Sequence, residues 1–297
     1  AHGALVTTDM ALTCSMFAAV YAFYRYARQP TPLRLAAAGF STGMTLAAKH
    51  SGVLIIPILS ALAFVELWFW WRARRVGAEA PPEKPESLLR HAARLALAVF
   101  AVVLISGGVL WGFYGLRFSA RPSPFKMPPL ADSLKWVKNR TASKAIALAA
   151  DAPLLPASYL HGMSYVLSGD ERPTYVLGKV YPRGQWFYFP VAFLIKSTLG
   201  FLLLLGLAVV VAKPLRRKWS REVLFLIVPA ALFFGVSLTA KINIGLRHIL
   251  PIYPFLLILA GAAAWVVIER KRAWTWLGGA LVLFHMLSSL RAYPNYL

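Results

Sequence analysis

Hydrophobic positions in this chain gather in long runs separated by short polar segments, and they rarely alternate with polar positions. A helical run of about 17–25 apolar residues matches the thickness of a bilayer core. Because every backbone group at that depth needs an internal partner, such runs are expected to be helices. We therefore predict an all-α polytopic membrane protein with about eight transmembrane helices. The predicted helices are Met10–Tyr26, Leu35–Ala48, Val53–Trp71, Leu95–Tyr114, Trp186–Ala212, Val223–Thr239, Ile249–Ile268 and Trp274–Leu290.

The short segments between these runs differ in charge, and the difference predicts an orientation. Four of them are rich in Lys and Arg, which is typical of cytoplasmic loops. These basic segments are Arg25–Arg34, Arg72–Arg94, Lys213–Arg221 and Glu269–Arg272. Eight crossings then place Asp9, Lys49 and Arg247 on the opposite, non-cytoplasmic side.

Residues 115–185 form the longest segment without a predicted span, and we expect them to be a functional non-cytoplasmic loop. Within this loop, Leu130–Ala150 carries apolar residues at helical spacing among lysines. That pattern predicts an amphipathic helix, lying either on the membrane surface or on the protein surface. We expect residues 1–297 to form one membrane-embedded domain.

Composition supports this class and excludes others. The chain is 59% hydrophobic and has a formal net charge of +21. Such a charge first suggests nucleic acid, but no aromatic-rich basic motif accompanies it, so we predict no nucleic-acid partner. The single Cys14 supports neither a disulfide framework nor a metal site. Because the chain opens on Ala1 and both ends lie beside apolar segments, we expect it to be the interior of a longer protein.

The segment Lys241–Pro254 carries the most informative polar residues. Arg247 and His248 lie there between two long apolar runs, followed by Pro251 and Pro254. A guanidinium near a bilayer core costs several kcal/mol unless it has a partner or a wet cavity. The prolines lack backbone N–H groups, so a regular helix must start late or break. These features together predict an anion-binding cavity at one membrane face.

Several other polar residues fall on the same predicted face. They are Asp9, Lys49, His50, Lys196, Lys241, Arg247 and His248. A mostly cationic pocket with one carboxylate suits a lipid-linked phosphate: the cations offset charge on the leaving phosphate, and the carboxylate orients or deprotonates an acceptor hydroxyl.

Each candidate also has a structural explanation that the residues alone leave open. The lysines can extend to the interface with their charges in water. His50 and His248 can cap helices through hydrogen bonds, and Asp9 directly precedes a run, as an N-cap residue does. Arg247 is the hardest to explain in this way, because apolar residues flank it on both sides.

Four stretches occur in an order that resembles a known family. They are ALVTTDMALT, GMTLAAKHSGVLIIP, YFPVAFLIKSTL and NIGLRHILPIYPFLLILAG. Together they are similar to membrane glycosyltransferases of the GT-C type, in particular family 39-like bacterial relatives of protein O-mannosyltransferases and aminoarabinose transferases.

The resemblance implies an inverting transferase that takes a sugar from a polyprenyl-phosphate donor on the periplasmic or extracellular face of the bacterial inner membrane. Asp9 matches the second acidic position of that family, and the first, the main catalytic base, would precede Ala1. Lys49, His50, Arg247 and His248 match positions near the lipid-phosphate pocket. Lys196 and Tyr253 are further donor-binding candidates by the same resemblance. A divalent metal is possible, and no other cofactor is implied.

Other functions remain open at this stage. One is a transporter or flippase for an anionic lipid or solute, although no internal repeat is visible. Another is a non-catalytic subunit of an envelope complex. For a transferase, the sequence leaves the sugar open, and the acceptor can be a protein, a lipid or a glycan.

Overall fold

The computed structural model describes residues 8–76, 87–119, 128–169, 171–243, 245–270 and 272–291. Most of these residues are helical, and within the described ranges the strands form one small hairpin. The prediction of an all-α polytopic membrane protein is confirmed.

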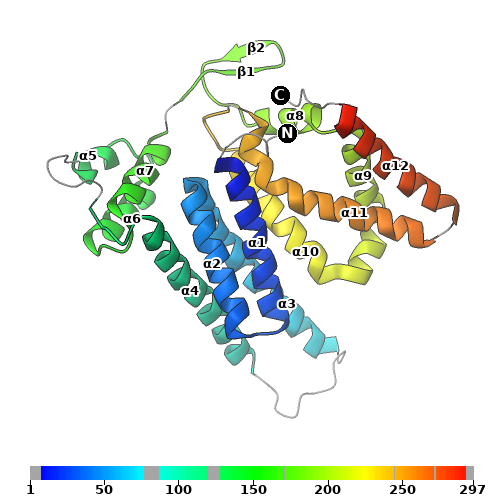
Figure 1. The fold of residues 1–297 in the computed structure, drawn as a ribbon, viewed down its shortest axis with the longest axis horizontal. Coiled ribbons are helices and arrows are strands. Elements are labelled where there is room, and N and C mark those ends of the chain that lie inside the picture. The colour runs from blue at the N-terminus through cyan, green and yellow to red at the C-terminus, as the bar shows by residue number, and fades with distance from the viewer. Residues whose placement is uncertain are drawn as a thin grey trace.

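The first half of the chain forms a bundle of long antiparallel helices, seen in blue and cyan in Figure 1. Its elements are α1 (Thr8–Arg28), α2 (Pro32–Ala48), the 3-10 helix η2 (His50–Leu54), α3 (Ile55–Val76) and α4 (Leu88–Phe113). Helix α2 lies between α1 and α4. Its glycines permit this approach, because a Cβ on Gly39 would lie 2.6 Å from Ile105 Cβ.

The second half packs beside this bundle. Its elements are α8 (Tyr188–Lys196), α9 (Leu199–Val210), α10 (Ala212–Ser237), the 3-10 helix η3 (Leu246–Ile252), α11 (Tyr253–Arg270) and α12 (Arg272–Arg291). Helices α9, α11 and α12 contact one another, while α10 packs on α3 and η3 packs on α1. The two halves therefore meet at α10 and η3.

The long connection between the halves is folded. It contains α5 (Leu130–Leu134), α6 (Arg140–Asp151), α7 (Ala157–Ser168) and the antiparallel strands β1 (Thr174–Val176) and β2 (Lys179–Tyr181). The single amphipathic helix expected over Leu130–Ala150 is split into α5 and α6. The split has a local cause: the Asn139 side chain accepts a hydrogen bond from Ala142 N and starts a new helix.

The expected number of spans is corrected by the structure. Among the described residues, four helical segments are long and apolar enough to cross a membrane, or five if one bent pair counts as a span. Helix α2 has 17 residues, but Pro32 and Arg34 lie in its first turn, so its uncharged run, Leu35–Ala48, is shorter than the about 17–25 residues that span a bilayer core. Helices α1 and α12 are long enough, but polar residues interrupt their apolar runs.

The bent pair is the segment predicted as one span over Trp186–Ala212. Helices α8 and α9 meet at 112° at a break over Ser197 and Thr198. Thr198 caps the N-terminus of α9, since its side chain accepts a hydrogen bond from Phe201 N at 3.4 Å. An N-capping residue inside an apolar run thus turns the chain sharply.

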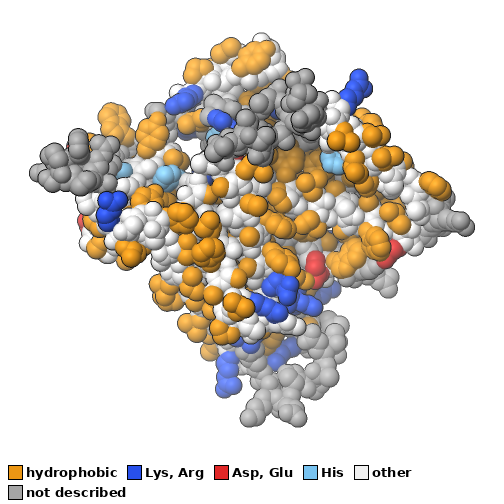
Figure 2. Space-filling view, in the orientation of Figure 1, with side chains coloured by type: hydrophobic (Ala, Val, Ile, Leu, Met, Phe, Trp, Pro, Cys, Tyr) orange, Lys and Arg blue, Asp and Glu red, His pale blue; other side chains and the backbone are white. Residues whose placement is uncertain are grey.

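One large core joins both halves, with buried residues from α1, α2, α3, α4, α10, η3 and α11. Two smaller clusters lie among α9, α10, α11 and α12. Many large apolar side chains remain exposed, including Phe64 on α3 at 72% and Leu97 on α4 at 67%. Figure 2 shows such side chains over much of the visible face, as expected for a lipid-facing surface.

Candidate active site at the α1, η2 and η3 junction

An ion pair between Asp9 and Lys49 forms the centre of the candidate site. Asp9 lies in the first turn of α1, inside the helix, where the helix dipole favours a negative charge. Lys49 is the extended residue between α2 and η2. Its Nζ donates to Asp9 Oδ1 at 2.6 Å, and the two side chains are 26% and 7% exposed. Two residues 40 positions apart thus share a nearly buried contact.

The chain can turn at Lys49 because of a glycine. Gly52 N donates to Lys49 O at 2.8 Å. A side chain on Gly52 would collide with the Thr45 carbonyl at the end of α2. The KHSG sequence therefore fixes a tight corner from which Lys49 reaches α1.

Arg247 and His248 reach the same region from η3. Gly245 precedes this helix with a φ of 136°, a conformation that favours glycine. Ile249 and Ile252 anchor η3 in the core at 0% and 3% exposure. His248 lies within the electrostatic reach of Asp9, Lys49 and Arg247. The structure therefore brings four predicted residues, Asp9, Lys49, Arg247 and His248, to one junction.

The Arg247 guanidinium differs from the other cations of this junction. It is half-buried, and among the described residues no hydrogen bond or ion pair engages it. Lys49, by contrast, already contacts a carboxylate. A half-buried guanidinium with open donors is suited to a planar or tetrahedral oxyanion, above all a phosphate.

His50 contacts the long connection. Its ring stacks on Tyr159 of α7 at 5.0 Å between centroids and lies against Gly162. Burial raises the pKa of Tyr159 to about 12. Neither His50 Nε2 nor the Tyr159 hydroxyl has a hydrogen-bond partner among the described residues. The structure thus places His50 at the contact between η2 and α7, beside the junction.

Tyr253 and Lys196 lie at the bend between α8 and α9. The Tyr253 hydroxyl is 2.8 Å from Ser197 Oγ, and its ring stacks on Phe201 at 5.7 Å. Lys196 ends α8 and is exposed. The structure shows no contact between these two residues and the Asp9–Lys49 pair.

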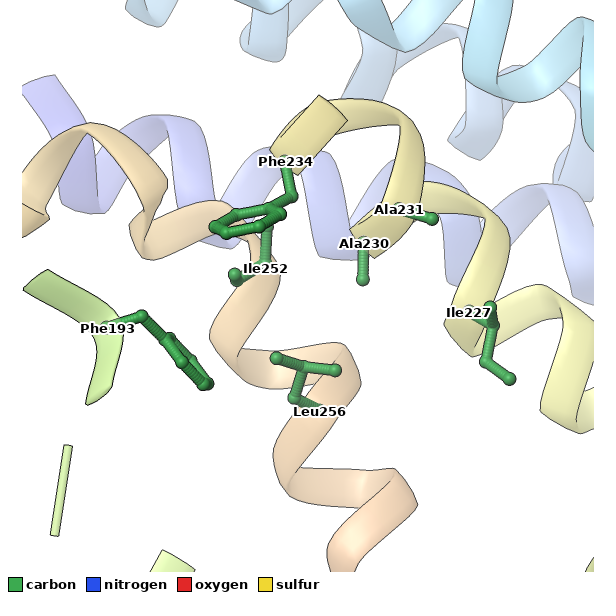
Figure 3. A pocket seen from close by; sticks show the side chains of 7 residues that line it. All are labelled: Phe193, Ile227, Ala230, Ala231, Phe234, Ile252 and Leu256. Carbon is green, nitrogen blue, oxygen red and sulfur yellow. The ribbon is translucent and has the colours of Figure 1, made fainter. Parts of the chain in front are cut away.

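An apolar pocket of about 240 Å³ lies beside η3, between α8, α10 and α11 (Figure 3). Ile252 of η3 lines it, so the helix that carries Arg247 also forms a pocket wall. Its lining side chains are Phe193, Ile227, Ala230, Ala231, Phe234, Ile252 and Leu256. Such a surface suits a hydrocarbon chain.

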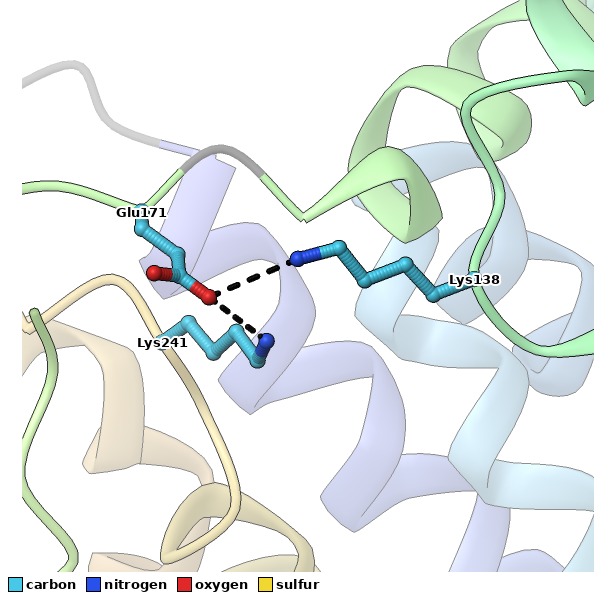
Figure 4. A network of polar contacts seen from close by, with 3 residues as sticks. All are labelled: Lys138, Glu171 and Lys241. Carbon is cyan, nitrogen blue, oxygen red and sulfur yellow. Dashed lines mark hydrogen bonds and ion pairs between the residues drawn. The ribbon is translucent and has the colours of Figure 1, made fainter.

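The long connection also forms an ion pair and hydrogen bonds with residues 241–243, the segment before η3. Lys241 Nζ and Lys138 Nζ lie 2.8 and 3.5 Å from Glu171 Oε1 (Figure 4). Gly184 N donates to Lys241 O, and Asn243 Nδ2 donates to Gln185 O.

The hydrogen bond from Lys241 lowers the pKa of Glu171, and the same contact raises the pKa of Lys241. Sequence reasoning missed Glu171 and Lys138. The only available signal was that Glu171 is one of 11 acidic residues in a strongly basic chain.

No group of three or more His, Cys, Asp or Glu side chains suited to a metal ion occurs in the described part of the chain. The junction itself offers one carboxylate and one imidazole beside two cations. Its chemistry is therefore that of an anion site with a carboxylate at its edge.

Comparison with known proteins supports one family. Residues 1–115 match the family model described as dolichyl-phosphate-mannose-protein mannosyltransferase. This confirms the predicted resemblance over α1 to α4, which carry Asp9, Lys49 and His50, and the matched range ends before Arg247. The match supports a membrane glycosyltransferase of the GT-C type. Searches of curated proteins and of solved structures found no match.

Proposed function

We propose that the protein transfers a sugar from a polyprenyl-phosphate donor to an acceptor on the periplasmic or extracellular face of a bacterial inner membrane. The observation that carries this proposal is the convergence of an Asp9–Lys49 pair with Arg247, which has no hydrogen bond or ion pair among the described residues and lies on the 3-10 helix whose Ile252 lines an apolar pocket. The family match over residues 1–115 supports the same reaction class.

The donor phosphate binds at Arg247, with Lys49 as the second cation. Both charges lie on the side where the leaving phosphate gains charge during transfer. Fixed cations at that position stabilise the transition state more than the ground state. The Arg247 fork also fixes the orientation of the phosphate through paired N–H donors.

The transfer itself exchanges one bond for another at the anomeric carbon. The acceptor oxygen bonds to this carbon from the side opposite the phosphate, so the configuration inverts. The sugar–phosphate C–O bond breaks, and its electron pair leaves with the phosphate. A carboxylate takes the acceptor proton.

Asp9 supports this step in two ways. Its Oδ1 holds Lys49 in place at 2.6 Å. Its second oxygen carries no hydrogen bond from the described residues and faces the acceptor side in this proposal. Asp9 therefore positions Lys49 and the acceptor, beside a second acidic residue upstream of Ala1 that serves as the main base.

The prenyl chain of the donor lies in the apolar pocket beside η3. Ile252 and Leu256 continue from the Arg247 helix into that pocket, so the phosphate and the first isoprenes bind to one continuous element. Because the prenyl chain comes from the bilayer and not from water, the pocket contributes shape and van der Waals contacts rather than a hydrophobic transfer free energy.

In this proposal the described part of the long connection covers the site from outside the membrane. Their contacts to Lys241 and Asn243 hold the segment that leads into η3. His50 fixes the other edge through its stack on Tyr159. In this proposal the acceptor enters between these two contacts.

The predicted charge asymmetry supports the orientation. The Arg25–Arg34 turn lies at the end of the α1–α4 bundle opposite to Asp9 and Lys49 (Figure 1). Basic segments favour the cytoplasmic side, so the junction faces the other way.

The test uses the full-length protein with polyprenyl-phosphate-linked hexoses and pentoses, and it measures release of polyprenyl phosphate by mass spectrometry. We expect Arg247→Ala to lower kcat about 100-fold or more, and Arg247→Lys to recover part of it. Arg183→Ala removes an exposed arginine outside the junction and serves as the matched control.

Unchanged transfer in both Arg247→Ala and Asp9→Asn would refute the residue assignment. Donor binding without any release of polyprenyl phosphate would instead refute the transferase and favour a transporter or a non-catalytic subunit.

A further inference from the structure

The end of the bundle opposite to the junction carries a repeated pairing of aromatic and arginine side chains. In four cases an arginine lies over an aromatic ring four residues earlier in the same helix. These pairs, which we name the aromatic–arginine collar, are Tyr21–Arg25 on α1 at 5.8 Å, and Trp68–Arg72, Trp70–Arg74 and Trp71–Arg75 on α3 at 5.5, 4.1 and 4.0 Å.

The direction of the pairs matches the boundary of a bilayer. Each arginine lies about one turn, or 5.4 Å, beyond its aromatic partner toward the helix end. Tyr21 and Trp68 are 51% and 44% exposed, and Trp71 is 37% exposed. Trp70 stacks on His91 of α4 at 4.6 Å, which ties the collar to the neighbouring helix. Aromatic rings at this depth are typical of the headgroup level, with cations just outside.

Two acidic groups of the described residues near the collar already have other partners. Glu66 pairs with Arg221 at 3.4 Å, and Glu222 accepts a hydrogen bond from Tyr24 at 2.9 Å. Among the described residues, no carboxylate forms an ion pair with Arg72, Arg74 or Arg75. Figure 2 shows Lys and Arg side chains gathered over this lower part of the bundle. The collar therefore presents exposed arginines, and no carboxylate among the described residues forms an ion pair with those of α3.

Stacking determines what the arginines can still bind. A guanidinium on an aromatic ring uses its flat face and keeps the N–H donors at its edge. Those donors suit a phosphate. The apolar side chains Phe64 and Leu97, one or more turns deeper on α3 and α4, are 72% and 67% exposed. A ligand of this surface thus has a phosphate at the collar and hydrocarbon below it.

We propose that the collar binds anionic phospholipid headgroups in the leaflet around this end of the protein. Net negative charge is required because the ammonium of a zwitterionic headgroup would be repelled by the clustered arginines. Lys and Arg near an anionic membrane surface each strengthen the attraction to it. This site is separate from the proposed transfer reaction and stands or falls independently of it.

The test compares lipid retention by the whole chain. The protein is purified from bilayers of equal parts phosphatidylglycerol and phosphatidylcholine, and bound lipids are counted by native mass spectrometry. We expect phosphatidylglycerol to be retained about tenfold over phosphatidylcholine, and this preference to fall to near parity in the R72Q/R74Q/R75Q variant. The R72K/R74K/R75K variant keeps the charge but loses the planar stack, so it should show only part of the preference for phosphatidylglycerol.

The matched control is K135Q/K179Q/R183Q, which removes three exposed cations from the long connection. It should retain the full preference. Equal retention of both lipids by the unmodified chain, or equal losses in the collar and control variants, would overturn the proposal. If the triple glutamine variant does not fold by circular dichroism, R74Q and R75Q carry the test singly, each with a partial loss expected and no loss overturning it.

Discussion

Two buried carboxylate–cation pairs hold the bundle at its opposite ends, and they are almost equally shielded from solvent. At one end Asp9 and Lys49 are 7% and 26% exposed, and at the other Glu66 and Arg221 are 6% and 23% exposed. Both pairs join segments far apart in the sequence. Burial of charge therefore does not by itself distinguish a reaction site from a structural contact.

The surroundings of the two pairs do distinguish them. Arg221 stacks on Phe69 at 5.5 Å and follows a backbone break at Trp219, so its pair with Glu66 fixes the start of the apolar part of α10. Near Asp9 and Lys49 lies the half-buried Arg247, which has no hydrogen bond or ion pair among the described residues, and Ile252 of the same helix, η3, lines an apolar pocket. The Glu66 pair lies in the interior instead: Glu66 Oε1 is buried, has no hydrogen bond among the described residues and is held by the ion pair to Arg221.

The comparison is tested most strongly by Asp9→Asn, which removes one charge with little change in shape. We expect the rate of sugar transfer to fall about 100-fold or more, because Lys49 and the acceptor both lose their anchor. Glu66→Gln should leave that rate within about twofold, since it acts through folding alone. Release of polyprenyl phosphate measures both variants. A comparable loss of kcat in both would break the distinction between the two pairs.

Glu66→Gln should act on stability instead. It leaves a largely buried Arg221 without its charge partner, so we expect a loss of about 2 kcal/mol in the free energy of unfolding. The loss is measured as a lower thermal midpoint in detergent. Asp132→Asn, which opens the exposed pair with Lys135 at 2.7 Å, serves as the control with almost no effect. Equal midpoints for all three proteins would contradict a structural role for Glu66.

The apolar pocket offers a further test of the difference between the junction and the Glu66–Arg221 pair. Ala230→Phe places a ring into it, and we expect the KM for long-chain donors to rise about tenfold, since several methylenes lose their contacts. Donors with one or two isoprene units should keep their KM. The control is Leu232→Phe, at an exposed position of α10 that does not line the pocket. Equal changes in KM for long and short donors would show that the prenyl chain binds outside this pocket.

The smallest effect is expected at the exposed contact of Glu171 with Lys241. The lowered pKa of Glu171 means that its contribution is complete above pH 4.5 and is lost as the pH falls through the lowered pKa. The raised pKa of Lys241 means that its contribution is complete below pH 10.5 and is lost as the pH rises through the raised pKa.

The contact should therefore hold between these two limits. Hydrogen exchange of residues 171–185 and 241–243, corrected for intrinsic rates, measures it. We expect Glu171→Gln at neutral pH to change protection about twofold or less. A loss of protection well above twofold would show that exposure is a poor guide to the strength of these ion pairs.

Local pattern predicted much of the architecture. Every long apolar run is helical in the described residues, and the charge of the short turns placed Asp9, Lys49 and Arg247 at one end. These features follow from helix formation and from the cost of burying charge, both of which depend on residue type and near neighbours.

The number of spans predicted from apolar runs was wrong because it ignored the length of the helices and the bends between them. Helix α2 packs against α1 and, through Gly39 and Gly43, against α4, although its uncharged run is too short to pass as a span. The 112° bend after Lys196 depends on a cap at Thr198, which a hydropathy pattern does not register.

The sequence by itself determined the class, the helical segments and the end of the bundle at which the charged residues lie. Only the tertiary structure decided that Lys49 meets Asp9, that its neighbour His50 meets Tyr159, and that no described residue bonds to the Arg247 guanidinium. The reason is physical: a helix is closed by hydrogen bonds four residues apart, whereas these contacts depend on how helices tens of residues apart pack and on where a glycine turns the chain.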